Sequence, residues 1–71
     1  MEIIFKTINW YYCEIYKKRK FLGKKLIGIA MLDINDELTL YLNDSNKETY
    51  QEASIIALKA KQYILWSREY E

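Results

Sequence analysis

LTLYLNDSNKE, residues 38–48, contains the change from a strand pattern to a helix start on which the predicted fold depends. Its first five residues alternate in polarity or size, which places the three leucines on one face of a strand. Ser45 and Glu48 then have the spacing of a capping box, in which the two side chains satisfy free N–H groups of the first helical turn. The stretch predicts a strand over residues 38–42 and a helix that begins at or near Ser45.

The predicted helix continues to about residue 68 and has two apolar faces. Neither Gly nor Pro interrupts it, and its alanines and lysines favour a helix. At about 100° per residue, one stripe is rich in alanine and consists of Tyr50, Ala53, Ile56, Ala57, Ala60, Tyr63 and Ile64. The opposite side, called the bulky stripe below, consists of Ile55, Leu58, Leu65 and Trp66 around Gln62. Because a helix on a sheet buries only one side, the bulky stripe is either covered by the N-terminal segment or used in an interface.

The N-terminal half is rich in residues that prefer strands. β-Branched and aromatic side chains dominate residues 3–16, which form either one long bent strand or two short ones broken near residues 7–9. A turn is expected around residues 19–23, followed by a strand over residues 25–33. An Asn-Asp turn then leads into the strand over residues 38–42, as in a hairpin.

Together these elements predict one α+β domain that comprises residues 1–71. Its architecture is a three-stranded antiparallel meander with one C-terminal α-helix packed on one face, a β-β-β-α arrangement.

The composition argues against several classes of enzyme. The chain has 71 residues and contains no His, so it has no imidazole base and no Ser–His or Cys–His pair. A single cysteine cannot form a closed zinc site, and Cys13 is expected to be a buried small hydrophobe. The acids Asp33, Asp36, Glu37 and Asp44 fall in expected turns, where carboxylates usually cap the backbone. The sequence therefore predicts no catalytic residue, no metal and no cofactor.

Two features bear on the membrane. The longest apolar run, residues 26–32, is far shorter than the roughly 20 residues that a spanning helix needs. Residues 1–6 lack the basic start and long apolar core of a signal peptide. The expected location is the cytoplasm, or the host cytosol for a viral protein, without membrane contact.

Positive charge is concentrated in one short run. Residues 1–30 contain seven Lys or Arg against two acids, whereas residues 31–71 contain four against eight. Six of the nine residues from 17 to 25 are basic, and they are called the basic run below: Lys17, Lys18, Arg19, Lys20, Lys24 and Lys25. Such a run is either a polyanion-binding end or the solvated tip of a hairpin.

Nucleic-acid binding is the first functional hypothesis. Lysine and arginine neutralise phosphates, and aromatic side chains stack on exposed bases. Trp10 and Tyr12, in the aromatic segment before the basic run, are the candidate stacking residues.

Three segments resemble the arm-type DNA-binding domains of phage and transposon integrases and the related AP2-like fold. They are the aromatic Trp10-Tyr11-Tyr12, the turn Gly23-Lys24-Lys25, and the helix start SNKET at residues 45–49. The chain departs from that family in the longer connection from Gly23 to Ser45 and in the lack of an aromatic residue before Ser45. The resemblance implies DNA binding.

The alternative hypothesis is a protein-directed effector. A small chain rich in Lys, Ile, Asn and Tyr and without Pro is typical of phage, mobile-element or archaeal viral proteins, which include inhibitors of host enzymes and defence systems such as anti-CRISPR proteins. Tyrosine and tryptophan are frequent interface anchors. The expected partners are thus nucleic acid or a host protein that handles it. The bulky stripe is expected to form a homodimer or a hetero-complex.

Overall fold

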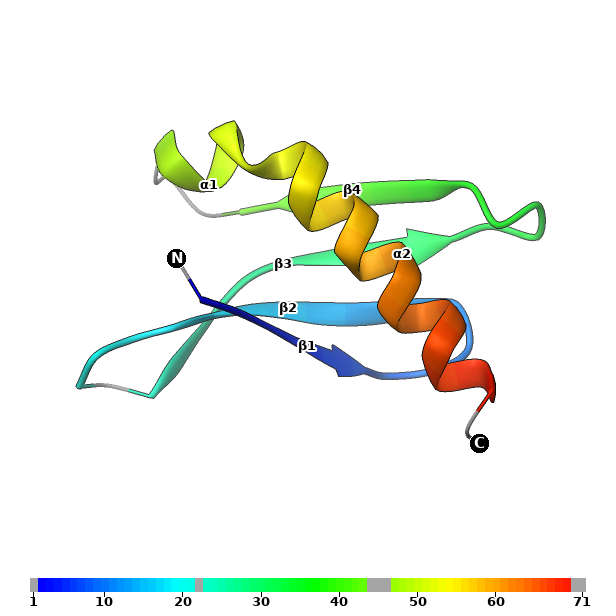
Figure 1. Cartoon of the computed structure of the whole chain (residues 1–71), viewed down its shortest axis with the longest axis horizontal. Helices are drawn as coiled ribbons and strands as arrows, with labels where there is room; N and C mark the ends of the chain where they lie inside the picture. The colour runs from blue at the N-terminus through cyan, green and yellow to red at the C-terminus, as the bar shows by residue number, and fades with distance from the viewer. Residues whose placement is uncertain (1, 22, 44–46, 70–71) are drawn as a thin grey trace.

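The computed structural model describes residues 2–21, 23–43 and 47–69. Its elements, in chain order, are β1 (Ile3–Thr7), β2 (Tyr12–Lys18), β3 (Lys24–Leu32), β4 (Leu38–Leu42), α1 (Lys47–Gln51) and α2 (Ala53–Glu69). The strands form one antiparallel sheet in the order β1-β2-β3-β4, and α2 crosses one face of it (Figure 1). The predicted α+β class, antiparallel sheet and C-terminal helix are confirmed.

The number of strands differs from the prediction, because the sheet has four strands rather than three. Residues 3–16 form two short strands joined by a tight turn at Asn9. The Asn9 Oδ1 atom accepts hydrogen bonds from the backbone N–H groups of Tyr11 and Tyr12, at 2.8 and 3.2 Å. This side-chain turn reverses the chain without Gly or Pro. For that reason the sequence pattern did not distinguish one long bent strand from two short ones.

The β2–β3 ladder contains a bulge at Ile27 and Gly28. Ile15 pairs with Gly28 and Tyr16 pairs with Leu26, so that β3 has one extra residue at this point. A Cβ atom at Gly28 would overlap the carbonyl oxygen of Tyr41 on β4. Only glycine allows the two strands to approach so closely here.

The turn between β3 and β4 confirms the predicted Asn-Asp hairpin. The Asp33 carboxylate accepts hydrogen bonds from the backbone N–H groups of Asn35 and Glu37, at 2.8 and 3.0 Å. Asp36 adopts a positive φ of 60°, a conformation that Asp tolerates better than most residues.

The C-terminal helix is divided at Glu52 into α1 and α2. Helical hydrogen bonds nevertheless continue through the division, from Glu52 N–H to Glu48 C=O and from Ile56 N–H to Glu52 C=O, at 3.1 and 2.9 Å. The predicted start at Ser45 lies outside the described residues.

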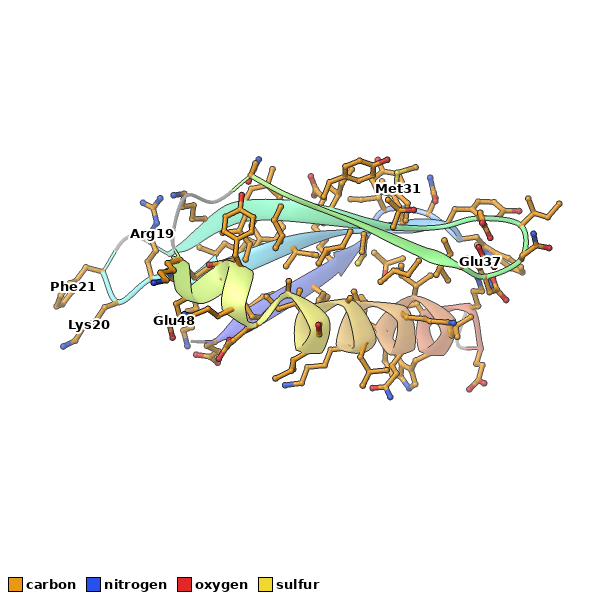
Figure 2. The ribbon with its side chains drawn as sticks, turned by 90° about the horizontal axis from the view of Figure 1, so that it is seen from above. Arg19, Lys20, Phe21, Met31, Glu37 and Glu48 are labelled. Carbon is orange, nitrogen blue, oxygen red and sulfur yellow. The ribbon has the colours of Figure 1, made fainter. Side chains whose placement is uncertain are left out.

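The core lies between α2 and one face of the sheet (Figure 2). Its buried members are Cys13, Ile15, Ile27, Ala30, Leu32, Ile56, Ala60 and Ile64. The three helix members belong to the alanine-rich stripe, as expected. Phe5 of β1 stacks on Tyr63 of α2, with ring centroids 5.6 Å apart. Since β1 is a strand of the sheet, it does not cover the outer side of α2.

The opposite face of the sheet is not covered by any element that the structure describes. Strand alternation and register place six large side chains side by side on it, called the open-face patch below: Tyr12, Tyr16, Leu26, Ile29, Met31 and Tyr41. Figure 2 shows Met31 on the side of the sheet away from the helix. The sheet therefore has one face in the core and one that is open and largely apolar.

Candidate nucleic-acid interface

The basic run forms the end of the β2–β3 hairpin. The turn is closed by a hydrogen bond of 2.6 Å from the Arg19 N–H group to the Gly23 carbonyl oxygen, and Gly23 has a positive φ of 73°. The side chains of Arg19, Lys20 and Phe21 extend away from the body of the molecule (Figure 2). The hairpin thus presents its cations at one end of the long axis.

The two strands divide the lysines between the two faces of the hairpin. Lys18 pairs with Lys24 on the open face of the sheet, and Lys17 pairs with Lys25 on the helix side. Lys18 also lies 3.6 Å from the Glu2 carboxylate. Cross-strand pairs of like charge repel each other, and a bound polyanion would relieve that repulsion.

Tyr16 is the aromatic residue nearest to the open-face cations. The Lys24 Nζ atom lies 4.3 Å from the centroid of the Tyr16 ring, within the range of a cation–π contact. The Tyr16 hydroxyl donates a hydrogen bond of 2.9 Å to Glu14. This hydrogen bond raises the pKa of Tyr16, with smaller contributions from burial and then from the charge of the Glu14 carboxylate. The ring therefore stays neutral and is held in a fixed position beside the ammonium group.

Phe21 is the most exposed aromatic residue of the hairpin. Its side chain is 87% exposed and lies within the basic run, with the Lys20 Nζ atom 5.6 Å from the ring centroid. The ring is therefore accessible to a partner of the basic run.

The structure does not bring Trp10 to the basic run. Trp10 lies in the β1–β2 turn, at the opposite end of β2, where the Arg68 guanidinium is 5.9 Å from its ring. Tyr12 lies on the open face, but it is six residues before Lys18 and hence about 20 Å away along an extended strand. The predicted site is thus divided, with its six cations at one end and Trp10 at the other.

Sequence reasoning missed Tyr16 and Phe21 as candidate stacking residues. Both were visible in the sequence, since Tyr16 directly precedes the basic run and Phe21 lies within it. The alternation of β2 also places Tyr16 on the same face as Lys18.

The opposite end of the molecule is acidic. The β3–β4 turn carries Asp33, Asp36 and Glu37, called the acidic turn below. Figure 2 shows Glu37 at the far end from Arg19 and Lys20. The acidic turn thus lies at the end opposite the basic run, although Glu48 of α1 lies at the same end as Arg19 and the Asp36 carboxylate is paired with Arg68.

The bulky stripe is only partly exposed. Ile55, Leu58 and Trp66 are each more than half exposed, with Leu58 at 59%. Leu65 is half-buried and packs against the core. The stripe therefore offers three exposed side chains rather than four.

Cys13 has the properties of a structural cysteine. Its side chain is fully buried, and burial raises the pKa of the thiol to about 11, an effect that a backbone hydrogen bond at Ala30 partly opposes. The thiolate is the reactive form, so this thiol is a poor nucleophile at neutral pH.

Within residues 2–21, 23–43 and 47–69, no three His, Cys, Asp or Glu residues gather in a way that could hold a metal ion. Over the same residues, no helix has the length and apolar character needed to cross a membrane.

Comparison of the chain with protein-family models finds no match. Comparisons with curated proteins and with solved structures likewise find none.

Proposed function

We propose that this chain is a non-enzymatic, nucleic-acid-binding module of phage or mobile-element type that contacts phosphates through the basic run. The observation that carries the proposal is the concentration of six cations, together with Phe21 and Tyr16, on one protruding hairpin. The acidic turn lies at the opposite end of the molecule, and the six cations of the hairpin outnumber the nearby Glu2.

The expected contacts follow from the placement of the side chains. Arg19 and Lys20 lie at the turn and reach phosphates on either side of it, as a two-stranded ribbon does in a major groove. Phe21 and Tyr16 have π-faces on which exposed bases stack. Counterion release makes such binding strongly dependent on salt, since each phosphate contact contributes a log–log slope of about −0.9 on duplex DNA.

A salt titration of matched charge variants tests the proposal. Arg19→Ala/Lys20→Ala removes two cations from the hairpin, and the control Lys59→Ala/Lys61→Ala removes two from α2. Fluorescence anisotropy with labelled duplex and single-stranded oligonucleotides gives the affinity at each salt concentration. The hairpin variant should reduce the magnitude of the duplex slope by about 1.8, whereas the control should keep the wild-type slope.

Two exposed apolar residues test the stacking contact. Phe21 and Ile34 are 87% and 91% exposed and lie at the turns of opposite ends. Phe21→Ala should weaken binding to single strands by about 1–3 kcal/mol, and Ile34→Ala should have no effect. The proposal fails if the wild type binds no DNA or RNA at low salt, or if both charge variants change the slope equally.

The second candidate function is inhibition of a host enzyme or defence system by protein–protein binding. It is favoured by the exposure of Ile55, Leu58 and Trp66 on the outer side of α2. A host protein captured by the wild type after nuclease treatment, but not by Leu58→Asp, would support this function. A capture that nuclease abolishes would instead support the first proposal.

A further inference from the structure

The open-face patch is an apolar surface that no described element covers. Tyr41 is 55% exposed, Met31 and Leu26 are about two-fifths exposed, and Ile29 is half-buried between them. Tyrosine and methionine are enriched in protein interfaces, and charged residues are depleted from interface centres. Lys6 and Glu14, paired on β1 and β2, lie on the same face. Lys6 is on the edge strand, whereas Glu14 lies between Tyr12 and Tyr16 and accepts a hydrogen bond from the Tyr16 hydroxyl. The face is thus largely apolar, with one hydrogen-bonded carboxylate inside it and a lysine at its border.

We propose that the open-face patch binds the same patch of a second copy of this chain, so that two sheets stack with their helices outside and their strands running in opposite directions. This proposal goes beyond the proposed function and does not rest on it. It places Tyr16, Lys18 and Lys24 of the open face inside the dimer, so that the turn residues Arg19, Lys20 and Phe21 are the ones left to contact nucleic acid in the dimer.

The area of the face suits a stable dimer. The molecule measures 34 × 22 × 15 Å, and its shortest axis runs through the sheet and the helix (Figures 1 and 2). A rectangle of the two longer extents, which include the protruding hairpin, measures about 750 Å², so the sheet face lies toward the lower end of the roughly 600–1,000 Å² per partner of standard interfaces. Two sheets that pack face to face lie about 10 Å apart, with interdigitated side chains.

The distribution of charge selects the direction of the strands. A two-fold axis in the plane between the sheets makes the strands of the two copies run either in the same or in opposite directions. In the first arrangement the two basic runs lie together and repel each other. In the second, each basic run lies over the acidic turn of the other copy, and the opposite charges attract. The second arrangement is therefore the one proposed.

The bulky stripe is a weaker candidate for the same role. Its exposed members, Ile55, Leu58 and Trp66, extend over twelve residues of a convex helix surface. The open-face patch combines six side chains from three neighbouring strands on one plane. A self-complementary contact favours the flatter and more continuous surface.

Analytical ultracentrifugation over a range of concentrations tests the surface. The wild type should have twice the 8.6 kDa mass of the chain. Met31→Lys/Tyr41→Lys should be monomeric with an unchanged circular dichroism spectrum, whereas Leu58→Lys/Trp66→Lys should remain dimeric. If the double variant of the sheet unfolds, Tyr41→Lys alone, at a position more than half exposed, replaces it. A monomeric wild type, or a dimer broken only by the helix variant, would overturn the proposal.

The direction of the strands is tested by a spin label on the hairpin. Lys20→Cys in a Cys13→Ala background carries one nitroxide per copy, and pulsed electron resonance measures the distance between the two labels. Opposite strand directions should give a distance on the order of the 34 Å length of the molecule or more. A dimer with strands in the same direction would give a much shorter distance, because its two hairpins lie side by side; that result would overturn the proposed arrangement.

Discussion

Arg68 joins three segments that are far apart in the sequence, and its replacement should destabilise the fold strongly. Its Nε–H group donates a hydrogen bond of 2.9 Å to the carbonyl oxygen of Trp10, and its guanidinium lies 2.9 Å from the Asp36 carboxylate. The same group lies within 6 Å of the Trp10 and Tyr11 rings. One side chain near the end of α2 thereby holds the β1–β2 turn and the β3–β4 turn.

The magnitude follows from these contacts. A hydrogen bond from a charged donor contributes about 1.5–3 kcal/mol. The Arg68 side chain is only 18% exposed, but Asp36 is 47% exposed, so the ion pair adds only about 0.5–1 kcal/mol. Because the contributions are not additive, Arg68→Ala should lower the free energy of unfolding by about 2–3 kcal/mol. A chain of 71 residues has about 3.5–10 kcal/mol in total, so this loss is a large fraction.

Urea denaturation followed by circular dichroism measures the effect. Lys59→Ala, which removes a cation from an exposed position of the same helix, serves as the control and should change the stability by less than about 0.5 kcal/mol. A double-mutant cycle with Asp36→Asn, which keeps a residue suited to positive φ, should give a coupling of about 1 kcal/mol. Equal effects of Arg68→Ala and Lys59→Ala would show that the three-segment contact does not stabilise the fold.

Three further substitutions test other elements. Gly28→Ala should lower the free energy of unfolding by about 2–3 kcal/mol, because the added Cβ atom would overlap the Tyr41 carbonyl oxygen. The control Gly23→Ala places its Cβ atom in open space and is strained only in φ, so it should cost about 1 kcal/mol. Urea denaturation measures both. Burial raises the pKa of Cys13 from 9.0 to about 11, so between these pH values the unfolded thiol loses its proton first, and stability should fall by up to about 3 kcal/mol as pH rises. Denaturation midpoints should show this fall in the wild type relative to Cys13→Ala, and parallel pH profiles would contradict it. Asn9→Ala should cost about 1 kcal/mol by removing an acceptor for two backbone N–H groups, and Asn9→Asp should restore most of it; equal melts for the two variants would exclude the Asn9 turn as a source of stability.

The local parts of the fold could be predicted because short-range chemistry determines them. The strand over residues 38–42 coincides with β4, and the Asn-Asp turn lies where its side chains cap the backbone. The break between β1 and β2 at Asn9 was harder to predict, because the aromatic residues beside it continue a strand pattern and the turn depends on one side chain. The bulge at Gly28 was not predicted, because the glycine is required by the approach of β4, which only the tertiary structure shows.

The sequence analysis located the cations of the candidate site but did not identify the aromatic residues beside them. A basic run beside a Gly-containing turn can be located from the sequence alone, and it lies at the hairpin as expected. Which aromatic residue lies next to it depends on the direction of the strand, which carries Tyr16 toward the basic run and Trp10 away from it. The contact of Trp10 with Arg68 joins residues 58 positions apart, and no local pattern indicates it.

The order of the strands has a consequence for how the chain folds. Each strand pairs only with the next one in sequence, so the sheet can grow hairpin by hairpin with little loop-closure entropy. The helix closes the longest loops, as in the hydrogen bond of 2.9 Å between Thr7 and Ser67, which are 60 residues apart. During synthesis all four strands therefore leave the ribosome before α2 is complete, and the nascent sheet has both apolar faces exposed in that interval. We expect this stage, rather than the native state, to be the one at which the protein is most prone to aggregate and most dependent on chaperones.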